Sequence, residues 1–281
     1  MNSIHFKGGV SGSLVEIKGL VKMDKEFSEQ GYKVENSDSI IELNRNAISN
    51  LCELLKISRM STQAGIENAL FELFNKNVDR YIGLLKAFAN TPDIIKYSNN
   101  SDVIELVKKC GVANPSLVTP PILHVVSEKL ILNRAKVFTP PHQDVVSTKG
   151  SVGQVVVWIP LHAIAPENYG ICAWKGSHRN GLLESSYSEF GHTVAPNLVP
   201  VEPPTYITME NGDICVFSQY LIHETCTVGN FRMAVSFRFN DASDSSWAER
   251  NYFVPFTRSE DKTSYEDLRE VAPKKTNHYF L

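Results

Sequence analysis

The residues with the clearest chemical potential are a histidine and an aspartate one position apart, His142 and Asp144. Side chains alternate faces along an extended strand, so we expect both to point the same way and to offer a metal ion two ligands. His223, 81 residues later, offers a third ligand. Two histidines and one carboxylate form the facial triad of non-heme Fe(II) oxygenases, which leaves further metal positions open.

An arginine follows the distal histidine by nine residues and opens a strand-like run. Alternation along that run gives one face to Arg232, Ala234, Ser236 and Arg238. A buried arginine needs a partner, and its planar guanidinium suits a carboxylate. Each residue alone has a plainer interpretation. The H-x-D pair is then a surface or turn pair, His223 a core histidine, and Arg232 an edge-strand arginine in a surface salt bridge.

The elements that must position these residues fall into two parts. Residues 39–55 and 65–89 place apolar side chains on one stripe of a 3.6-residue period, and a shorter helix is expected at 101–110. Residues 27–35 indicate a short helix, a glycine stop and a strand. From 117 onward, short β-branched and aromatic runs between Pro and Gly favour a sandwich or barrel. The expected strands are 122–126, 130–138, 154–159, 207–209, 213–217, 220–227 and 232–239.

Composition narrows the class of protein. The chain has 281 residues, 42% hydrophobic and 21% charged, with a net charge of −3. This is an ordinary globular composition, and the charge gives no long-range argument for a nucleic-acid or membrane partner. We expect no signal peptide and no membrane span. Five scattered cysteines without a C-x-x-C pair predict free thiols and a cytoplasmic location.

Several short motifs accompany the proposed ligands. They are His142-Gln143-Asp144, Trp158-Ile159-Pro160-Leu161, Asn168-Tyr169-Gly170, Gly176-Ser177-His178, Gly212-Asp213, His223 and Arg232. Together they resemble the phytanoyl-CoA dioxygenase (PhyH-like) family of Fe(II)/2-oxoglutarate-dependent oxygenases, over about 120–240. The segment 27–34 is similar to that family's N-terminal F-x-x-x-G-Y motif. One departure is Lys175, which stands where relatives have proline; it concerns a loop and not the metal ligands.

The resemblance implies an α+β fold with a double-stranded β-helix (jelly-roll, cupin-like) core and N-terminal supporting helices. It implies Fe(II) held by His142, Asp144 and His223. It further implies that Arg232 binds the distal carboxylate of the co-substrate 2-oxoglutarate. Thr225 shares the face of His223 by parity and is expected against the same carboxylate. Further candidates are Asn133 on the co-substrate side, and Gln143, Trp158 and Arg238 on the substrate side.

The activity that the resemblance implies is hydroxylation of a small-molecule biosynthetic intermediate by O₂, with 2-oxoglutarate converted to succinate and CO₂. The intact carboxylate ligand Asp144 argues against halogenation, since halogenating relatives carry a small residue there. General resemblance to family members of that sort favours a polar, sugar-related substrate. The alternatives are a non-enzymatic jelly-roll metal-binding module and a metal enzyme that does not use 2-oxoglutarate.

The domain organisation is expected to be a single unit over 1–281. We expect helical support at about 36–115, the jelly-roll core at about 117–240 and a C-terminal extension at 241–281. No linker or internal repeat divides the chain. The sequence sets no oligomeric state.

Overall fold

The computed structural model describes residues 23–118, 120–132, 138–164, 168–188 and 191–252. It opens with a short helix, α1 (Lys25–Gln30), followed by strand β1 (Tyr32–Asn36). Between them Gly31 has a left-handed backbone with φ of 85°, and its N–H donates to the Phe27 carbonyl. Glycine adopts that conformation without steric cost, so it ends the helix here. The predicted helix, glycine stop and strand are confirmed.

Five helices follow between β1 and the next strand. They are α2 (Asp38–Leu55), α3 (Gln63–Lys76), α4 (Val78–Ala89), α5 (Pro92–Ser98) and α6 (Ser101–Lys109). The single helix predicted over 65–89 is wrong, because it breaks at Asn77 into α3 and α4. Asn77 has an extended backbone, and its side chain accepts a hydrogen bond from the Arg80 N–H at 2.8 Å. Asparagine is a preferred N-cap, so it starts a new helix within the apolar pattern.

The larger sheet has six antiparallel strands, in the order β1-β9-β4-β11-β2, with β3 also paired to β11. The strands after β1 are β2 (Pro115–Leu117), β3 (Ile122–Ser127), β4 (Val155–Pro160), β9 (Asp213–Ser218) and β11 (Phe231–Asp241). One edge of the long strand β11 pairs with β3 over 231–236 and then with β2 over 239–241. Its other edge pairs with β4.

Shorter strands form two further antiparallel sheets. One has the order β10-β5-β8, from β5 (Ile171–Ala173), β8 (Thr205–Ile207) and β10 (His223–Thr225). The other is a hairpin of β6 (Ser185–Ser188) and β7 (Gly191–Val194). The strand predicted at 220–227 is present only as the three residues of β10.

Short helices fill the connections, namely α7 (Glu128–Leu132), α8 (Val145–Thr148), α9 (Ser245–Glu249) and the 3₁₀ turns Ser177–Asn180 and Pro196–Leu198. The strand predicted at 130–138 is wrong where the structure describes it, because 128–132 are helical. That run has the β-branched and apolar composition of a strand, but no neighbouring strand pairs with it in the described residues.

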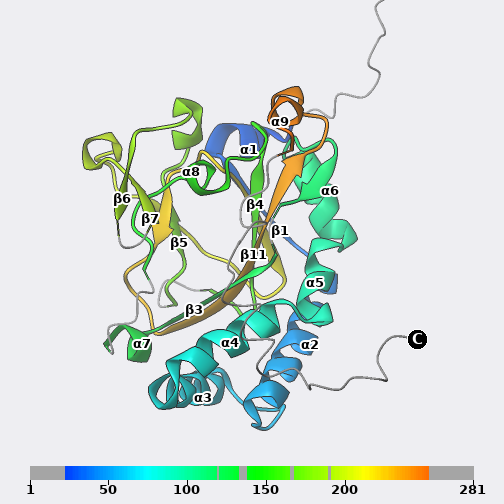
Figure 1. Ribbon diagram of the computed structural model, residues 1–281, viewed down its shortest axis with the longest axis vertical. Helices are drawn as coiled ribbons and strands as arrows, with labels where there is room; N and C mark the ends of the chain where they lie inside the picture. The colour runs from blue at the N-terminus through cyan, green and yellow to red at the C-terminus, as the bar shows by residue number, and fades with distance from the viewer. Residues whose placement is uncertain (1–22, 119, 133–137, 165–167, 189–190, 253–281) are drawn as a thin grey trace, which may run out of the picture.

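The two faces of the larger sheet bury different layers. Met233, Val235 and Phe237 of β11 pack with the apolar residues of the helices in one core cluster. Ala234, with Val156 and Trp158 of β4, packs against Ile171 and other residues of the smaller sheet in a second cluster. Figure 1 shows the helices α2 to α6 gathered on one side of the sheet and β5 to β7 on the other. The fold is therefore of mixed α and β type, with antiparallel sheets.

Parts of the expected organisation lie outside the described residues. Of the predicted extension 241–281, the structure describes 241–252, which includes the end of β11 and helix α9. None of the helices in the described part of the chain is both long enough and apolar enough to cross a membrane. The single unit over 1–281 stays a prediction.

The cysteines differ from the expectation of five free thiols. Cys172 in β5 and Cys226, directly after β10, form a disulfide. Cys52, Cys110 and Cys215 are free and buried. The two cysteines are 54 residues apart. Their spacing in the sequence therefore did not indicate that they would form a pair. The cytoplasmic location stays a prediction and loses its cysteine argument.

Thiol counting tests the disulfide. Protein denatured without reductant should react with three equivalents of a thiol reagent, and with five after reduction, as the three free cysteines and one disulfide require. The bond closes a long loop, so Cys226→Ser should lower the free energy of unfolding by about 2–4 kcal/mol in denaturant titrations. Wild-type protein kept in reductant is the control. Five reactive thiols in the unreduced sample would contradict the pairing.

Candidate metal centre

Backbone pairing brings the two candidate histidine ligands together. The His142 N–H donates to the His223 carbonyl at 3.0 Å, and the His223 N–H donates to the His142 carbonyl at 3.1 Å. A further bond, from the Thr225 N–H to the Thr139 carbonyl, extends the pairing. Residues that exchange both bonds in an antiparallel pair lie directly opposite each other. The two imidazole rings therefore lie side by side, with centroids 4.1 Å apart.

Hydrogen bonds also set which ring nitrogen of each histidine is available. Nδ1 of His142 lies 2.8 Å from the Pro140 carbonyl, and Nδ1 of His223 lies 3.0 Å from the Leu221 carbonyl. A carbonyl only accepts, so both Nδ1 atoms carry the proton. In the neutral rings both Nε2 atoms then keep a lone pair. This is the tautomer that a metal ligand needs, fixed by a second partner of the same ring.

Asp144 reaches the histidines from a turn and not from a strand. Its backbone is in the right-handed helical region, at the start of α8. Its Oδ1 lies 3.4 Å from His142 Nε2 and 4.0 Å from His223 Nε2. The predicted juxtaposition with His142 is therefore present, although strand alternation is not its cause.

The three ligand atoms form a compact group suited to one metal ion. One ligand atom from each of His142, Asp144 and His223 lies within 4.8 Å of the others. Ligands about 2.1 Å from a metal and at right angles to one another are about 3 Å apart, so a bound ion would draw the three atoms closer together. Two imidazoles and one carboxylate are donors that iron accepts. In this donor set and spacing, the group fits a facial triad.

Burial and neighbouring charges keep these groups in the protonation states that metal ligands require. Burial lowers the pKa of His223 to about 3, and His142 adds to the effect, so the ring is neutral. Burial alone would raise the pKa of Asp144. The Arg238 guanidinium outweighs it and holds that pKa well below its ordinary value. The carboxylate is therefore ionised.

Arg232 lies in the same cavity, and none of the described residues gives it a negative partner. It is 3% exposed, and its Nη1 donates to the Tyr169 and Gly170 carbonyls at 2.7 and 3.3 Å. Its Nε is buried with no hydrogen-bond partner. Among the described residues no carboxylate pairs with it, and burial lowers its pKa to about 10. A buried, ionised guanidinium with an orphaned donor is a site that an anion would complete.

Two predicted residues lie beside Arg232 in the cavity. The indole of Trp158 lies beneath the guanidinium, whose carbon is 5.5 Å from the ring centroid. That contact is a cation–π interaction. Trp158 also lines the cavity, and its substrate-side role stays a prediction. Thr225 is 7% exposed and lines the same cavity. Its predicted contact with the co-substrate carboxylate stays a prediction.

The remaining sequence candidates have three different outcomes. Asn133 lies outside the described residues. Gln143 is not at the cavity: its amide donates to the Gly181 and Tyr220 carbonyls and accepts from the Leu183 N–H, so it fixes loops behind the site. Arg238 does line the cavity, but it contacts Asp144, where the sequence suggested a substrate or a surface carboxylate.

The cavity has further lining residues that sequence reasoning did not assign. They include His124, Thr139, Ile171, Phe217, Glu224 and Ser236. His124 pairs with Ala234 across β3 and β11, and so shares the face of the two arginines. Cross-strand neighbours lie on the same face of a sheet. The position of His124 at the cavity could therefore be predicted only with knowledge of the strand register.

The fold, but not the sequence, matches known proteins. No family model matches the chain, and a search of curated proteins finds no match. The non-heme monooxygenase ThoJ in its apo form has a TM-score of 0.54 at 14% identity, over 77% of this chain and 76% of that one. The epimerase SnoN from nogalamycin biosynthesis, in complex with Fe³⁺, α-ketoglutarate and nogalamycin RO, has a TM-score of 0.54 at 15% identity, over 86% and 91%.

A third solved structure is EctD from S. alaskensis with 2-oxoglutarate and 5-hydroxyectoine. Its TM-score is 0.51 at 14% identity, over 78% of this chain and 75% of that one. At such identities the likeness is one of fold. The family predicted from the sequence motifs is therefore still a prediction.

Removing one candidate ligand tests the metal centre. We expect His223→Ala to lower the affinity for Fe(II) or Co(II) by more than about 100-fold, since loss of an outer partner alone costs 10–100-fold. Anaerobic calorimetric titration measures this. His192→Ala on strand β7 is the matched control, because that ring contacts Tyr187 and not the cavity. Equal loss in both variants, or no loss in either, would contradict the assignment.

Proposed function

We propose that the protein is an Fe(II)- and 2-oxoglutarate-dependent oxygenase that hydroxylates a small-molecule biosynthetic intermediate. We further propose that it belongs to the phytanoyl-CoA dioxygenase (PhyH-like) family, with a double-stranded β-helix core. The observation that carries the proposal is the pairing, in one buried cavity, of the His142–Asp144–His223 group with the uncompensated Arg232. A metal-binding module without a co-substrate has no use for such a buried cation.

Separate groups of residues bind the metal and the co-substrate. His142, Asp144 and His223 hold the metal, and Arg232 with the Thr225 hydroxyl binds the distal carboxylate of 2-oxoglutarate. Trp158 supports the guanidinium from below. When bound, iron and 2-oxoglutarate supply the oxidation, in which O₂, substrate C–H and 2-oxoglutarate give an alcohol, succinate and CO₂. No side chain need act as an acid or base for that step.

Charge supports the choice of co-substrate. Fe(II) adds two positive charges to the cavity and 2-oxoglutarate adds two negative ones, so loading both leaves the buried charge unchanged. The apolar side chains of Ile171 and Phe217 line the same space. The structures of SnoN and EctD, which are similar in fold, contain α-ketoglutarate and 2-oxoglutarate respectively, and this supports the proposal. Hydroxylation, in preference to halogenation, is proposed from the intact Asp144 carboxylate.

Co-substrate binding tests the proposal without knowledge of the substrate. Anaerobic protein with Fe(II) should develop a visible charge-transfer band when 2-oxoglutarate is added. Arg232→Ala should weaken 2-oxoglutarate binding by about 10- to 100-fold, the equivalent of one charged hydrogen-bond pair, with Fe(II) affinity retained. Arg232→Lys keeps the charge and should lose less.

The outcomes separate the alternatives. Slow succinate formation without substrate supports the enzyme. Metal binding without the charge-transfer band and without succinate, for any substrate tried, would favour the non-enzymatic module and contradict the proposal. Turnover that persists in the absence of 2-oxoglutarate would favour a metal enzyme of another kind.

A further inference from the structure

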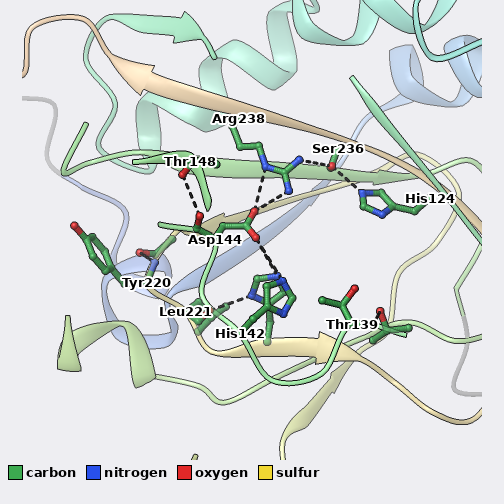
Figure 2. A network of polar contacts seen from close by, with 12 residues as sticks. His124, Thr139, His142, Asp144, Thr148, Tyr220, Leu221, Ser236 and Arg238 are labelled. Atoms are coloured by element: carbon green, nitrogen blue, oxygen red, sulfur yellow. Dashed lines mark hydrogen bonds and ion pairs between the residues drawn. The ribbon is translucent and has the colours of Figure 1, made fainter. Parts of the chain in front are cut away.

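A line of polar contacts runs from the candidate metal centre into the larger sheet. The Arg238 guanidinium donates to Asp144 Oδ2 from Nε at 3.1 Å and from Nη2 at 2.8 Å. Its Nη1 donates to Ser236 Oγ at 2.8 Å. That oxygen in turn lies 2.8 Å from His124 Nε2. Figure 2 shows the four side chains in this order, with His142 on the opposite side of Asp144.

The two oxygens of Asp144 have different surroundings. Oδ1 is the oxygen near the Nε2 atoms of His142 and His223. Oδ2 accepts both hydrogen bonds from Arg238. The Asp144 side chain is 8% exposed and the Arg238 side chain 11%. To bring both oxygens to a metal, the carboxylate would have to turn and break two charge-assisted bonds in a buried site, where such bonds are strongest.

Binding through a single oxygen of Asp144 matters because it determines how many metal positions stay free. A six-coordinate ion bound by two histidines and one carboxylate oxygen keeps three positions free. A chelating co-substrate and O₂ would together need all three of them. If Asp144 bound through both oxygens, only two positions would remain, and the co-substrate and O₂ would compete.

The partners of Arg238 hold its guanidinium in place. Ser236 is two residues before Arg238 on β11, so the two side chains share a face. His124 comes from the neighbouring strand β3, where it is opposite Ala234. With Nη1 held by the serine, the remaining donors Nε and Nη2 are directed at Asp144 Oδ2. A lysine has one flexible ammonium and cannot span both partners in a fixed plane.

We propose that Arg238, held by Ser236 and His124, is a positioning residue that restricts Asp144 to one-oxygen metal ligation. This inference rests on the proposed function in so far as the site binds a metal and 2-oxoglutarate. Arg238 thus differs in role from Arg232, which lies on the same strand face. One arginine acts on the ligand and the other on the co-substrate.

The test compares Arg238→Gln and Arg238→Lys with Arg232→Ala. We expect Arg238→Gln to lower Fe(II) affinity by about 10- to 100-fold, the usual effect of losing a partner of a metal ligand. Arg238→Lys should recover part of that loss. The visible spectrum of the Co(II)-loaded protein should change in both variants, because it reports ligand arrangement. Arg232→Ala should leave Fe(II) affinity and the Co(II) spectrum as in wild type.

The controls separate positioning from folding. Arg179→Gln is the matched control, since this exposed guanidinium donates to the Ser28 and Glu29 carbonyls and does not line the cavity. Ser236→Ala should give a smaller loss of Fe(II) affinity than Arg238→Gln, and it removes no charge. Circular dichroism and thermal melts of each metal-free variant show which of them fold.

Three results would overturn the inference. One is wild-type Fe(II) affinity and Co(II) spectrum in folded Arg238→Gln. Another is weakened 2-oxoglutarate binding with unchanged Fe(II) affinity, which would make Arg238 a co-substrate ligand. The third is loss of Fe(II) affinity in Arg179→Gln as well. If the proposed function itself is wrong, the wild-type protein will bind no Fe(II) or will give no charge-transfer band with 2-oxoglutarate.

Discussion

The two arginines on one face of β11 impose the constraint on which the cavity depends. A guanidinium taken out of water needs hydrogen-bond acceptors and a negative partner, or its burial costs several kcal/mol. Arg238 has both, in Asp144 and Ser236. Within the described residues, Arg232 has only two carbonyls and the indole of Trp158. The structure thus satisfies one buried cation internally and leaves the other for a ligand.

The same strand separates the site from the stabilising core. Met233, Val235 and Phe237 alternate with the polar residues and pack with the helices. The apolar face holds the sheet firmly, and the polar face is therefore carried on a rigid element. The histidine pair adds a second fixed point, because reciprocal backbone bonds set the separation of the two rings. Rigid support of this kind holds ligands near the geometry that a metal needs.

Much of the helical layer and most strands were accessible to sequence reasoning, since apolar periodicity reports which face is buried. The wrong helix boundary has a local cause, and one buried polar residue has a tertiary cause. A capping asparagine, Asn77, splits an apolar pattern that was otherwise continuous. The polar residue Asn44 is buried inside the stripe of α2, where its side chain bonds to the Pro160 carbonyl and to Tyr97. Neither partner can be known before the helix is placed on the sheet.

Sequence by itself determined the identity of the candidate ligands, the alternation that puts Arg232 and Arg238 on one face, and the apolar face behind them. These follow from residue type and the two-residue period of a strand. Only the tertiary structure decided that Asp144 contacts Arg238, that Gln143 turns away from the cavity, and that Cys172 meets Cys226. Each of these depends on the register between segments distant in the chain, which is set by cooperative packing and leaves no local pattern in the sequence.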